Sequence, residues 1–170
     1  MIMKTKGFTL VETLIAISIL VLAVTGAFSA AHSGMTSALY SKDQITAFYL
    51  AQEGIEQIRN LRDQNSLTSS NWMNGIANPG NPCEIGFTCY VDALSDTTPL
   101  IRCSGTCPNL RMNTNGFYSY DSGTDTRFRR EVRITTINGN EVVVESTVFW
   151  SKGLLVDRSF TAREHLFNWQ

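Results

Sequence analysis

The stretch Gly7-Phe8-Thr9-Leu10-Val11-Glu12 leads into an apolar run that continues to Ala31. Between Lys6 and Lys42, Glu12 is the only side chain that is an Asp, Glu, Lys or Arg. A carboxylate inside hydrocarbon is costly, so Glu12 without a partner would oppose insertion into a bilayer. The sequence therefore predicts that some other group neutralises Glu12, and the nature of that group is the main clue to function.

The uncharged run is long enough to cross a membrane once. Residues 14–31 contain no charged side chain and the uncharged stretch continues to Ser41, whereas about 20 apolar residues suffice for a transmembrane helix. Because Lys4 and Lys6 precede the run, the positive-inside rule predicts a cytoplasmic N-terminus and an extracytoplasmic C-terminal body. The net charge of −1 implies no polyanionic partner, and no nucleic acid is expected.

Periodicity predicts that a single helix continues well beyond the membrane. The chain from Phe8 to about Asp63 contains no proline and is predicted to form one helix, roughly 80 Å long at 1.5 Å per residue. Its first part is apolar all round. From about Met35 it becomes amphipathic, with apolar side chains at helical spacings: Ile45, Phe48, Ile55, Ile58 and Leu61. Because a bilayer needs only part of this length, the second half is expected to pack on the C-terminal body.

The last third of the chain predicts an antiparallel meander. Partial alternation predicts strands over residues 128–137 and 141–150, joined by a turn at Asn138-Gly139-Asn140. A second turn at Lys152-Gly153 leads to a third strand over residues 154–163. The face expected to cover the helix consists of Phe128, Val132, Ile134, Val142, Val144, Val148 and Trp150.

The region between helix and meander, residues 65–115, is predicted to be rich in loops. It holds all four prolines and all four cysteines, and a short strand over residues 88–94 would carry Cys89. An even, clustered cysteine count in an exported domain predicts disulfides, and the spacings do not suit a zinc site. Four cysteines allow three pairings. We favour the local pairs Cys83–Cys89 and Cys103–Cys107.

Gly7-Phe8-Thr9-Leu10-Val11-Glu12, after a basic leader and before an apolar helix, resembles the processing site of type IV prepilins and type II secretion pseudopilins. The resemblance is specific over residues 4–31. It implies a pilin-like α+β fold, in which a long N-terminal helix packs on a small antiparallel β-sheet. The first half of that helix would be transmembrane and the second half amphipathic.

The resemblance also implies what is done to the chain. In this family a membrane aspartyl peptidase cuts after the glycine and N-methylates the new first residue with S-adenosylmethionine. The cut would fall between Gly7 and Phe8, and Phe8 would carry the methyl group. The new amine is then the positive group that Glu12 lacks, because in family filaments the glutamate faces the amine of a neighbouring subunit. Such a pair fixes register rather than adding net stability.

The implied partners are other pilin subunits, the prepilin peptidase/methyltransferase, the inner-membrane assembly platform and membrane lipid. The expected segments are a class III leader peptide at 1–7, a transmembrane assembly segment at 8–34, an amphipathic helix half at 35–65 and an extracytoplasmic head at 66–170. Major pilins usually carry a proline in the membrane segment, and residues 26–31 have none. This favours a minor pilin or pseudopilin, a structural subunit that leaves the membrane when it enters a filament.

Two simpler interpretations of the N-terminus compete with this one. Ser29-Ala30-Ala31 could serve as the cleavage site of an ordinary secretory signal peptide. Against this interpretation, Glu12 lies inside the apolar core and the helical pattern continues after Ala31. A plain single-span anchor of an exported protein explains the hydrophobicity, but it does not explain the spacing from Gly7 to Glu12.

Other motifs suggest ligands more weakly. Two segments, Asn113-x-Asn115-Gly116 and Asp121 to Asp125, hint at a calcium loop but lack the EF-hand pattern. Turn chemistry is therefore favoured, and no metal or cofactor is expected. The arginines of residues 127–133 are interpreted as an ordinary solvated strand rather than a DNA site. A tip adhesin or DNA-capture pilin would use residues 71–125. Neither His32 nor His165 belongs to a catalytic motif, so no catalytic residue is assigned and no enzyme is expected.

Overall fold

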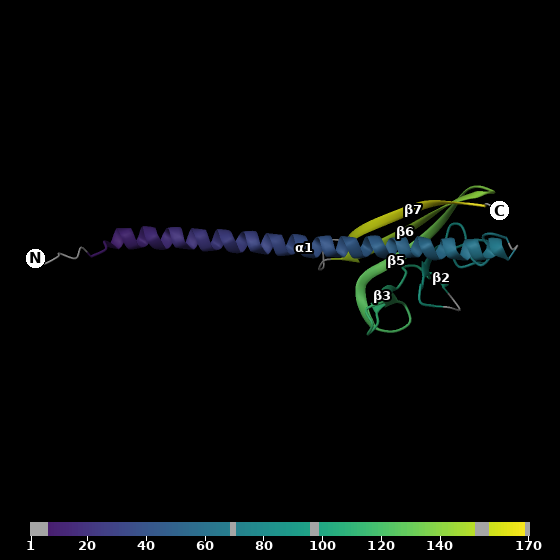
Figure 1. The fold of residues 1–170 in the computed structure, drawn as a ribbon, viewed down its shortest axis with the longest axis horizontal. Coiled ribbons are helices and arrows are strands. Elements are labelled where there is room, and N and C mark those ends of the chain that lie inside the picture. The colour runs from purple at the N-terminus through teal and green to yellow at the C-terminus, as the bar shows by residue number, and fades with distance from the viewer. Residues whose placement is uncertain (1–6, 69–70, 96–98, 152–156, 169–170) are drawn as a thin grey trace, which may run out of the picture. The chain divides into compact units, whose positions relative to one another are not determined.

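The computed structural model describes residues 7–68, 71–95, 99–151 and 157–168. Within them the chain forms one long helix followed by seven strands (Figure 1): α1 (Leu10–Leu67), β1 (Thr88–Val91), β2 (Leu100–Arg102), β3 (Asn109–Met112), β4 (Tyr118–Ser119), β5 (Thr124–Asn138), β6 (Glu141–Ser151) and β7 (Asp157–Phe167). The basic leader through Lys6 and the predicted turn at Lys152-Gly153 lie outside the described residues. The chain divides into two compact units, Met1–Lys42 and Asp43–Gln170.

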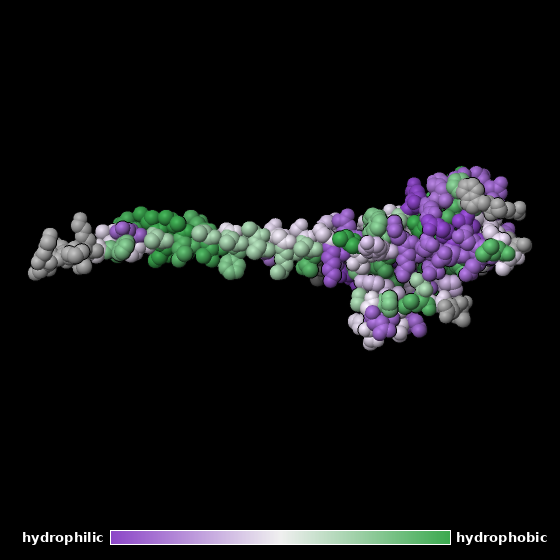
Figure 2. Space-filling model, viewed as in Figure 1, coloured by the Kyte–Doolittle hydropathy of each residue, from purple (hydrophilic) through white to green (hydrophobic). Residues whose placement is uncertain are grey.

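In the first unit, α1 is apolar and exposed along its length. Leu22 and Phe28 are 72% and 74% exposed, and Figure 2 shows hydrophobic side chains over this part of the helix. The segment is long and apolar enough to cross a membrane. Its hydroxyl groups bond within the helix: Ser18 Oγ donates to the Leu14 carbonyl at 2.8 Å, and Thr25 Oγ1 does the same one helical turn back. These hydroxyls therefore need no partner from lipid.

In the second unit, α1 buries one stripe of side chains against an antiparallel sheet. The buried positions recur every three or four residues: Asp43, Ala47, Leu50, Ala51, Gly54, Ile55, Ile58 and Arg62. The predicted amphipathic half is therefore present, but Ile45 is 57% exposed rather than buried. Phe48 lies at the margin, with its ring 5.4 Å from that of Phe160 on β7. The small residues of the stripe let the helix axis approach the sheet closely.

The sheet is organised around β5, the longest strand. Almost the whole length of β6 pairs with one edge of β5, and β7 pairs with the far edge of β6. β1 and β3 follow one another along the other edge of β5, and each forms a hairpin with the next strand, β2 and β4. The result is the predicted α+β architecture, a helix packed on a curled antiparallel sheet.

The predicted meander is present, with strand ends that differ from the prediction. β5 begins at Thr124, four residues before the predicted start, and β7 runs to Phe167 rather than Arg163. The turn between β5 and β6 includes an Asx contact in which Asn138 Oδ1 accepts the Asn140 amide at 2.9 Å. All seven residues of the predicted helix-facing surface are buried.

The region predicted to be rich in loops contains more strand than expected. β1, β2 and β3 all lie inside residues 65–115, although each strand has only three or four residues. β1 itself ends at Val91, three residues before the predicted end. Segments this short show no clear alternation in sequence, and they are held as strands because β5 and each other supply their hydrogen-bond partners.

One buried cation joins the helix to the sheet. Arg130 lies on the helix-facing side of β5 with a side chain only 1% exposed. Its guanidinium donates to the Leu50 carbonyl of α1 at 2.7 Å, to the Val91 carbonyl of β1, and to Glu53 Oε2 at 2.7 Å. Both terminal nitrogens of the guanidinium are bonded in this way, whereas Nε has no hydrogen-bond partner among the described residues. Because a buried guanidinium requires such acceptors, Arg130 is a specific clamp between three elements.

Candidate functional site

The candidate site is the segment that precedes and begins α1. Gly7 and Phe8 are exposed and lie outside the helix, and Phe8 is 80% exposed. The first helical residue is Leu10, and the Thr13 amide already donates to the Thr9 carbonyl at 3.2 Å. The peptide bond between Gly7 and Phe8 therefore lies in accessible, non-helical chain, which is the form of chain that a peptidase can bind.

Thr9 and Glu12 cap the helix reciprocally. The Glu12 amide donates to Thr9 Oγ1 at 3.3 Å, and the Thr9 amide donates to Glu12 Oε2 at 3.5 Å. This is a capping box, in which a threonine at the N-cap and a glutamate three residues later each satisfy a free backbone N–H. The signal Thr9-x-x-Glu12 is visible in the sequence, although the prediction for Glu12 concerned only the neutralisation of its charge and not a helix cap.

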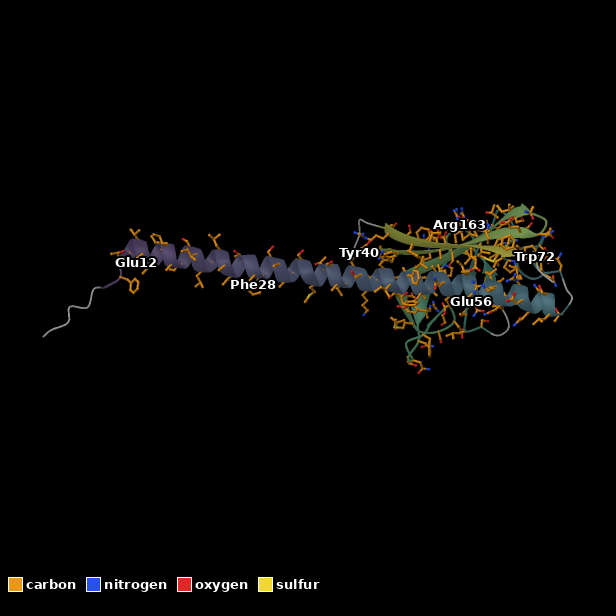
Figure 3. The ribbon with its side chains drawn as sticks, turned by 45° about the horizontal axis from the view of Figure 1, so that its top comes forward. Glu12, Phe28, Tyr40, Glu56, Trp72 and Arg163 are labelled. Atoms are coloured by element: carbon orange, nitrogen blue, oxygen red, sulfur yellow. A yellow bond between two sulfur atoms is a disulfide. The ribbon has the colours of Figure 1, made fainter. Side chains whose placement is uncertain are left out.

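The capping box holds the Glu12 carboxylate at the positively polarised N-terminus of the helix. A carboxylate in the first turn is stabilised by the partial positive charge of the helix N-terminus, by about 0.3–1 kcal/mol at an exposed site. Figure 3 shows Glu12 close to the beginning of α1, with Phe28 further along the same apolar stretch. The local cap therefore compensates part of the charge of Glu12, and it leaves the rest of that charge to be met by a cation.

The cysteines form the two local disulfides that the sequence favoured. Cys83 is bonded to Cys89 with a Cα–Cα distance of 5.1 Å, and Cys103 is bonded to Cys107 with 5.0 Å. The first pair is fully buried and joins the preceding loop to Cys89 of β1. The second pair, in which Cys107 is buried and Cys103 is half-buried, closes the loop between β2 and β3. Both bonds hold loops, and neither presents a free thiol for chemistry.

The candidate calcium loop is held by hydrogen bonds of its own asparagine. Asn113 Oδ1 accepts the amides of Asn115 and Phe117, each at 3.0 Å, so this loop is a turn held by its own asparagine. No group of three or more His, Cys, Asp or Glu side chains that could hold a metal ion occurs within the described part of the chain.

The arginines of β5 do not form a shared basic surface. Arg127 pairs with Asp43 at 2.9 Å, and Arg129 pairs with Glu131 at 3.1 Å while its guanidinium lies over the Phe149 ring. Arg130 is buried in the core, and Arg133 Nε donates to a threonine on β1. Because these side chains point in different directions and most have local partners, phosphate binding along this strand is not favoured.

The comparison with protein families agrees with the geometry at the N-terminus. The model of the prokaryotic N-terminal methylation motif matches residues 2–28, a span that contains Gly7, Phe8 and Glu12. This motif marks type IV prepilin-like proteins, and it points to an exported structural subunit rather than an enzyme. No curated protein and no solved structure matches the chain.

Proposed function

We propose that this type IV prepilin-like chain is a minor pilin or pseudopilin, a structural subunit of a type IV pilus or a type II secretion-like filament. The observation that carries the proposal is the methylation motif at residues 2–28, joined without a break to an exposed apolar helix. In this proposal, prepilin peptidase cuts between Gly7 and Phe8 and methylates the new amine of Phe8. The chain itself catalyses nothing.

Assembly gives Glu12 the cation that its own helix does not provide. The helix N-terminus compensates Glu12 only in part, through a Thr9 amide contact of 3.5 Å. The methylated amine of a neighbouring subunit carries a full positive charge at the same depth. A buried ion pair is stable only when both charges meet, so a subunit in the wrong register would leave two charges unpaired. The pair therefore selects the register of assembly.

The exposed apolar side chains of α1 must be shielded from water both before and after assembly. Its exposed leucine, isoleucine, valine and phenylalanine side chains form a continuous surface in the first unit. A surface of this size is not stable in water, and it must be covered either by lipid or by the same segment of other subunits. We propose lipid before assembly and neighbouring helices in the filament.

The proposed organisation keeps the segments expected from sequence. The leader is residues 1–7, the membrane and assembly segment is 8–34, the amphipathic half is 35–65 and the head is 66–170. The N-terminus would be cytoplasmic and the head extracytoplasmic, and the inner-membrane assembly platform would bind the subunit. α1 is an uninterrupted helix through residues 26–31, which supports a minor subunit without the usual proline.

The test of this function is incorporation into filaments. Cells of the source organism that express Glu12→Ala should insert the protein in the membrane at the wild-type level, since a costly charge has been removed. The sheared filament fraction should nevertheless contain at least about tenfold less of the variant, because one unpaired buried charge costs more than 1.4 kcal/mol.

The matched control is Glu56→Ala, which removes an exposed carboxylate from the second half of α1. It should enter filaments as the wild-type protein does. Normal incorporation of Glu12→Ala would contradict the pairing argument, and absence of the wild-type chain from every filament fraction would contradict the proposed function as a whole.

A further inference from the structure

The second unit contains a cleft between two hairpins that share one edge of β5. β1 pairs with β5 at Val132 and Arg133, whereas β3 pairs with it between Thr124 and Arg129. The β1–β2 and β3–β4 hairpins therefore lie one after the other along this edge. The cleft between them has a volume of about 460 Å³, within the usual range for small-molecule sites.

The two walls of the cleft are tied together beneath its opening. Asp92, which follows β1, is 5% exposed. Its Oδ1 accepts the Leu94 amide at 3.1 Å, and its Oδ2 accepts the Tyr120 amide from the other hairpin at 3.1 Å. Tyr120 also packs against Tyr90 of β1, with ring centroids 4.4 Å apart. These contacts hold the two hairpins together without a ligand, which lowers the entropic cost of ordering them when a ligand binds.

The lining of the cleft combines apolar faces with neutral hydrogen-bonding groups. Tyr90 and Ile101 are direct partners across the β1–β2 pair and present a ring and an aliphatic side chain on one wall. The other wall carries the side-chain amide of Asn113 and the hydroxyl group of Ser122, whereas the buried Ser119 hydroxyl donates to the Ser122 carbonyl at 3.4 Å. Among the described lining residues there is no lysine, arginine or histidine. The charged groups among these residues are the carboxylates of Asp92 and Asp121, so an anionic ligand is disfavoured.

The phenol groups remain neutral donors over the physiological range. Burial raises the pKa of Tyr120 to about 12. Burial and the nearby Asp92 carboxylate raise the pKa of Tyr90 as well. Both hydroxyl groups are therefore protonated at neutral pH. The Tyr120 hydroxyl donates to the Arg130 carbonyl at 3.5 Å, so Tyr90 is the phenol that can donate to a ligand.

We propose that this cleft binds a saccharide, a neutral polyhydroxylated ligand with an apolar C–H face. The Tyr90 ring and Ile101 suit the C–H face of a sugar ring. The Asn113 amide, the Ser122 hydroxyl and the Asp121 carboxylate suit its hydroxyl groups. The site goes beyond a structural role in a filament, because an exported head that carries it could attach to a glycan. Its chemistry does not depend on cleavage at Gly7 or on assembly.

The test is saturation-transfer NMR on the full chain in a zwitterionic detergent that has no sugar headgroup. The probes are glucose, galactose, mannose and N-acetylglucosamine, each at millimolar concentration. We expect saturation transfer from the protein to at least one of them. Tyr90→Ala should weaken binding of that sugar by about fivefold, because it removes the ring that packs against the sugar. Phe117→Ala, which removes an exposed aromatic ring that does not line this cleft, should bind as the wild type does.

A second variant is used if circular dichroism shows that Tyr90→Ala does not fold. Ile101→Glu changes a side chain that is 37% exposed on the same wall, and it should abolish transfer while leaving the fold intact. The proposal is overturned by absence of transfer to all four sugars. It is also overturned by unchanged binding in Ile101→Glu, or by transfer to glucose 6-phosphate alone, which would indicate an anion site instead. None of these results bears on filament incorporation.

Discussion

Glu12 has two successive partners in this account, and both follow from its position in the first turn of α1. In the single chain it caps its own helix with Thr9, through contacts of 3.3 and 3.5 Å. In a filament we propose that it faces the amine of a neighbour. The capping box keeps the carboxylate at the helix N-terminus, where an incoming amine can reach it. Thr9 is thus a positioning residue for Glu12.

Replacing Thr9 tests the cap directly. Thr9→Ala removes the hydroxyl oxygen that accepts the Glu12 amide, and the loss of such a cap costs about 1 kcal/mol. We expect the Glu12 amide to exchange its hydrogen about fivefold faster in detergent micelles, measured by NMR. Thr9→Ser keeps the hydroxyl and should exchange at nearly the wild-type rate. Equal rates in all three proteins would show that the cap does not hold the helix end.

Gly54 is the residue that sets how closely α1 approaches the sheet. A Cβ atom at this position would lie 2.6 Å from Ser146 Oγ and 3.1 Å from Arg130 Cδ. An added methyl group therefore meets packed atoms of two strands. Helix propensity alone would predict that alanine is better than glycine here by about 1 kcal/mol, so the two effects have opposite signs and a measurement can separate them.

We predict that Gly54→Ala destabilises the protein by about 1–3 kcal/mol through overpacking. Thermal unfolding followed by circular dichroism would measure the change. Ser146→Ala provides the matched rescue, because it removes the nearest atom. Its buried hydroxyl has no hydrogen-bond partner among the described residues, so its loss alone should not destabilise. The double variant should recover most of the lost stability, and a Gly54→Ala protein as stable as the wild type would refute the close approach.

At the scale of elements, β5 shows what a single sequence can and cannot predict. Alternation assigns Phe128, Val132 and Ile134 to the helix-facing side, and all three are buried. The interpretation of the arginines as a solvated strand is wrong for Arg130, whose side chain is 1% exposed. The turn at residues 138–140 also follows from local chemistry. The acceptors that allow Arg130 into the core come from α1 and β1, at Leu50 and Val91. They are 80 and 39 residues away in sequence, and no local pattern indicates them.

Most structural features that the sequence did not predict depend on contacts with distant parts of the chain. β2, β3 and β4 are two to four residues long, and they are strands because a long neighbour supplies their hydrogen bonds. Ile45 has the right type and spacing for the buried face, yet small residues of α1 occupy the contact instead. The cleft between the hairpins depends on two strands that meet the same edge of β5, and this arrangement is tertiary. In contrast, Thr9-x-x-Glu12 is a local signal that could have been recognised.

The loop that carries the buried disulfide is held to β2 by an ion pair with a pH signature. Glu84 Oε2 accepts from the Arg102 guanidinium at 2.6 Å and from the Gly80 amide at 3.2 Å. The bond from Arg102, with a further contribution from Gly80, lowers the pKa of Glu84 below its ordinary value of 4.5. A carboxyl group whose pKa is lowered by folding stabilises the folded state above its unfolded pKa, and this stabilisation is lost as pH falls through the folded pKa.

We therefore predict that Glu84→Gln lowers the melting temperature at pH 7, and that its difference from the wild type disappears below the folded pKa of Glu84. Melting curves of both proteins between pH 7 and pH 3 would measure this. In an Arg102→Gln background the Glu84→Gln change should have little effect, since the partner is already absent. A difference that stays constant across this pH range would show that the ion pair does not contribute.

At the scale of the whole molecule, the two units carry different parts of the function. The first unit supplies an apolar helix with one carboxylate near its start, and it contains the entire methylation motif. The second unit supplies a disulfide-bonded head with a ligand-sized cleft. Only the first contains a segment that matches a known family motif, at residues 2–28.

The central claim is that the chain is cut between Gly7 and Phe8 before it functions. Intact-mass and N-terminal analysis of the protein purified from membranes of the source organism tests it most directly. The account predicts that residues 1–7 are absent and that Phe8 begins the chain with one added methyl group, about 14 Da. A mature protein that keeps Met1, or one that begins near His32 as a secretory signal peptide would give, would contradict it.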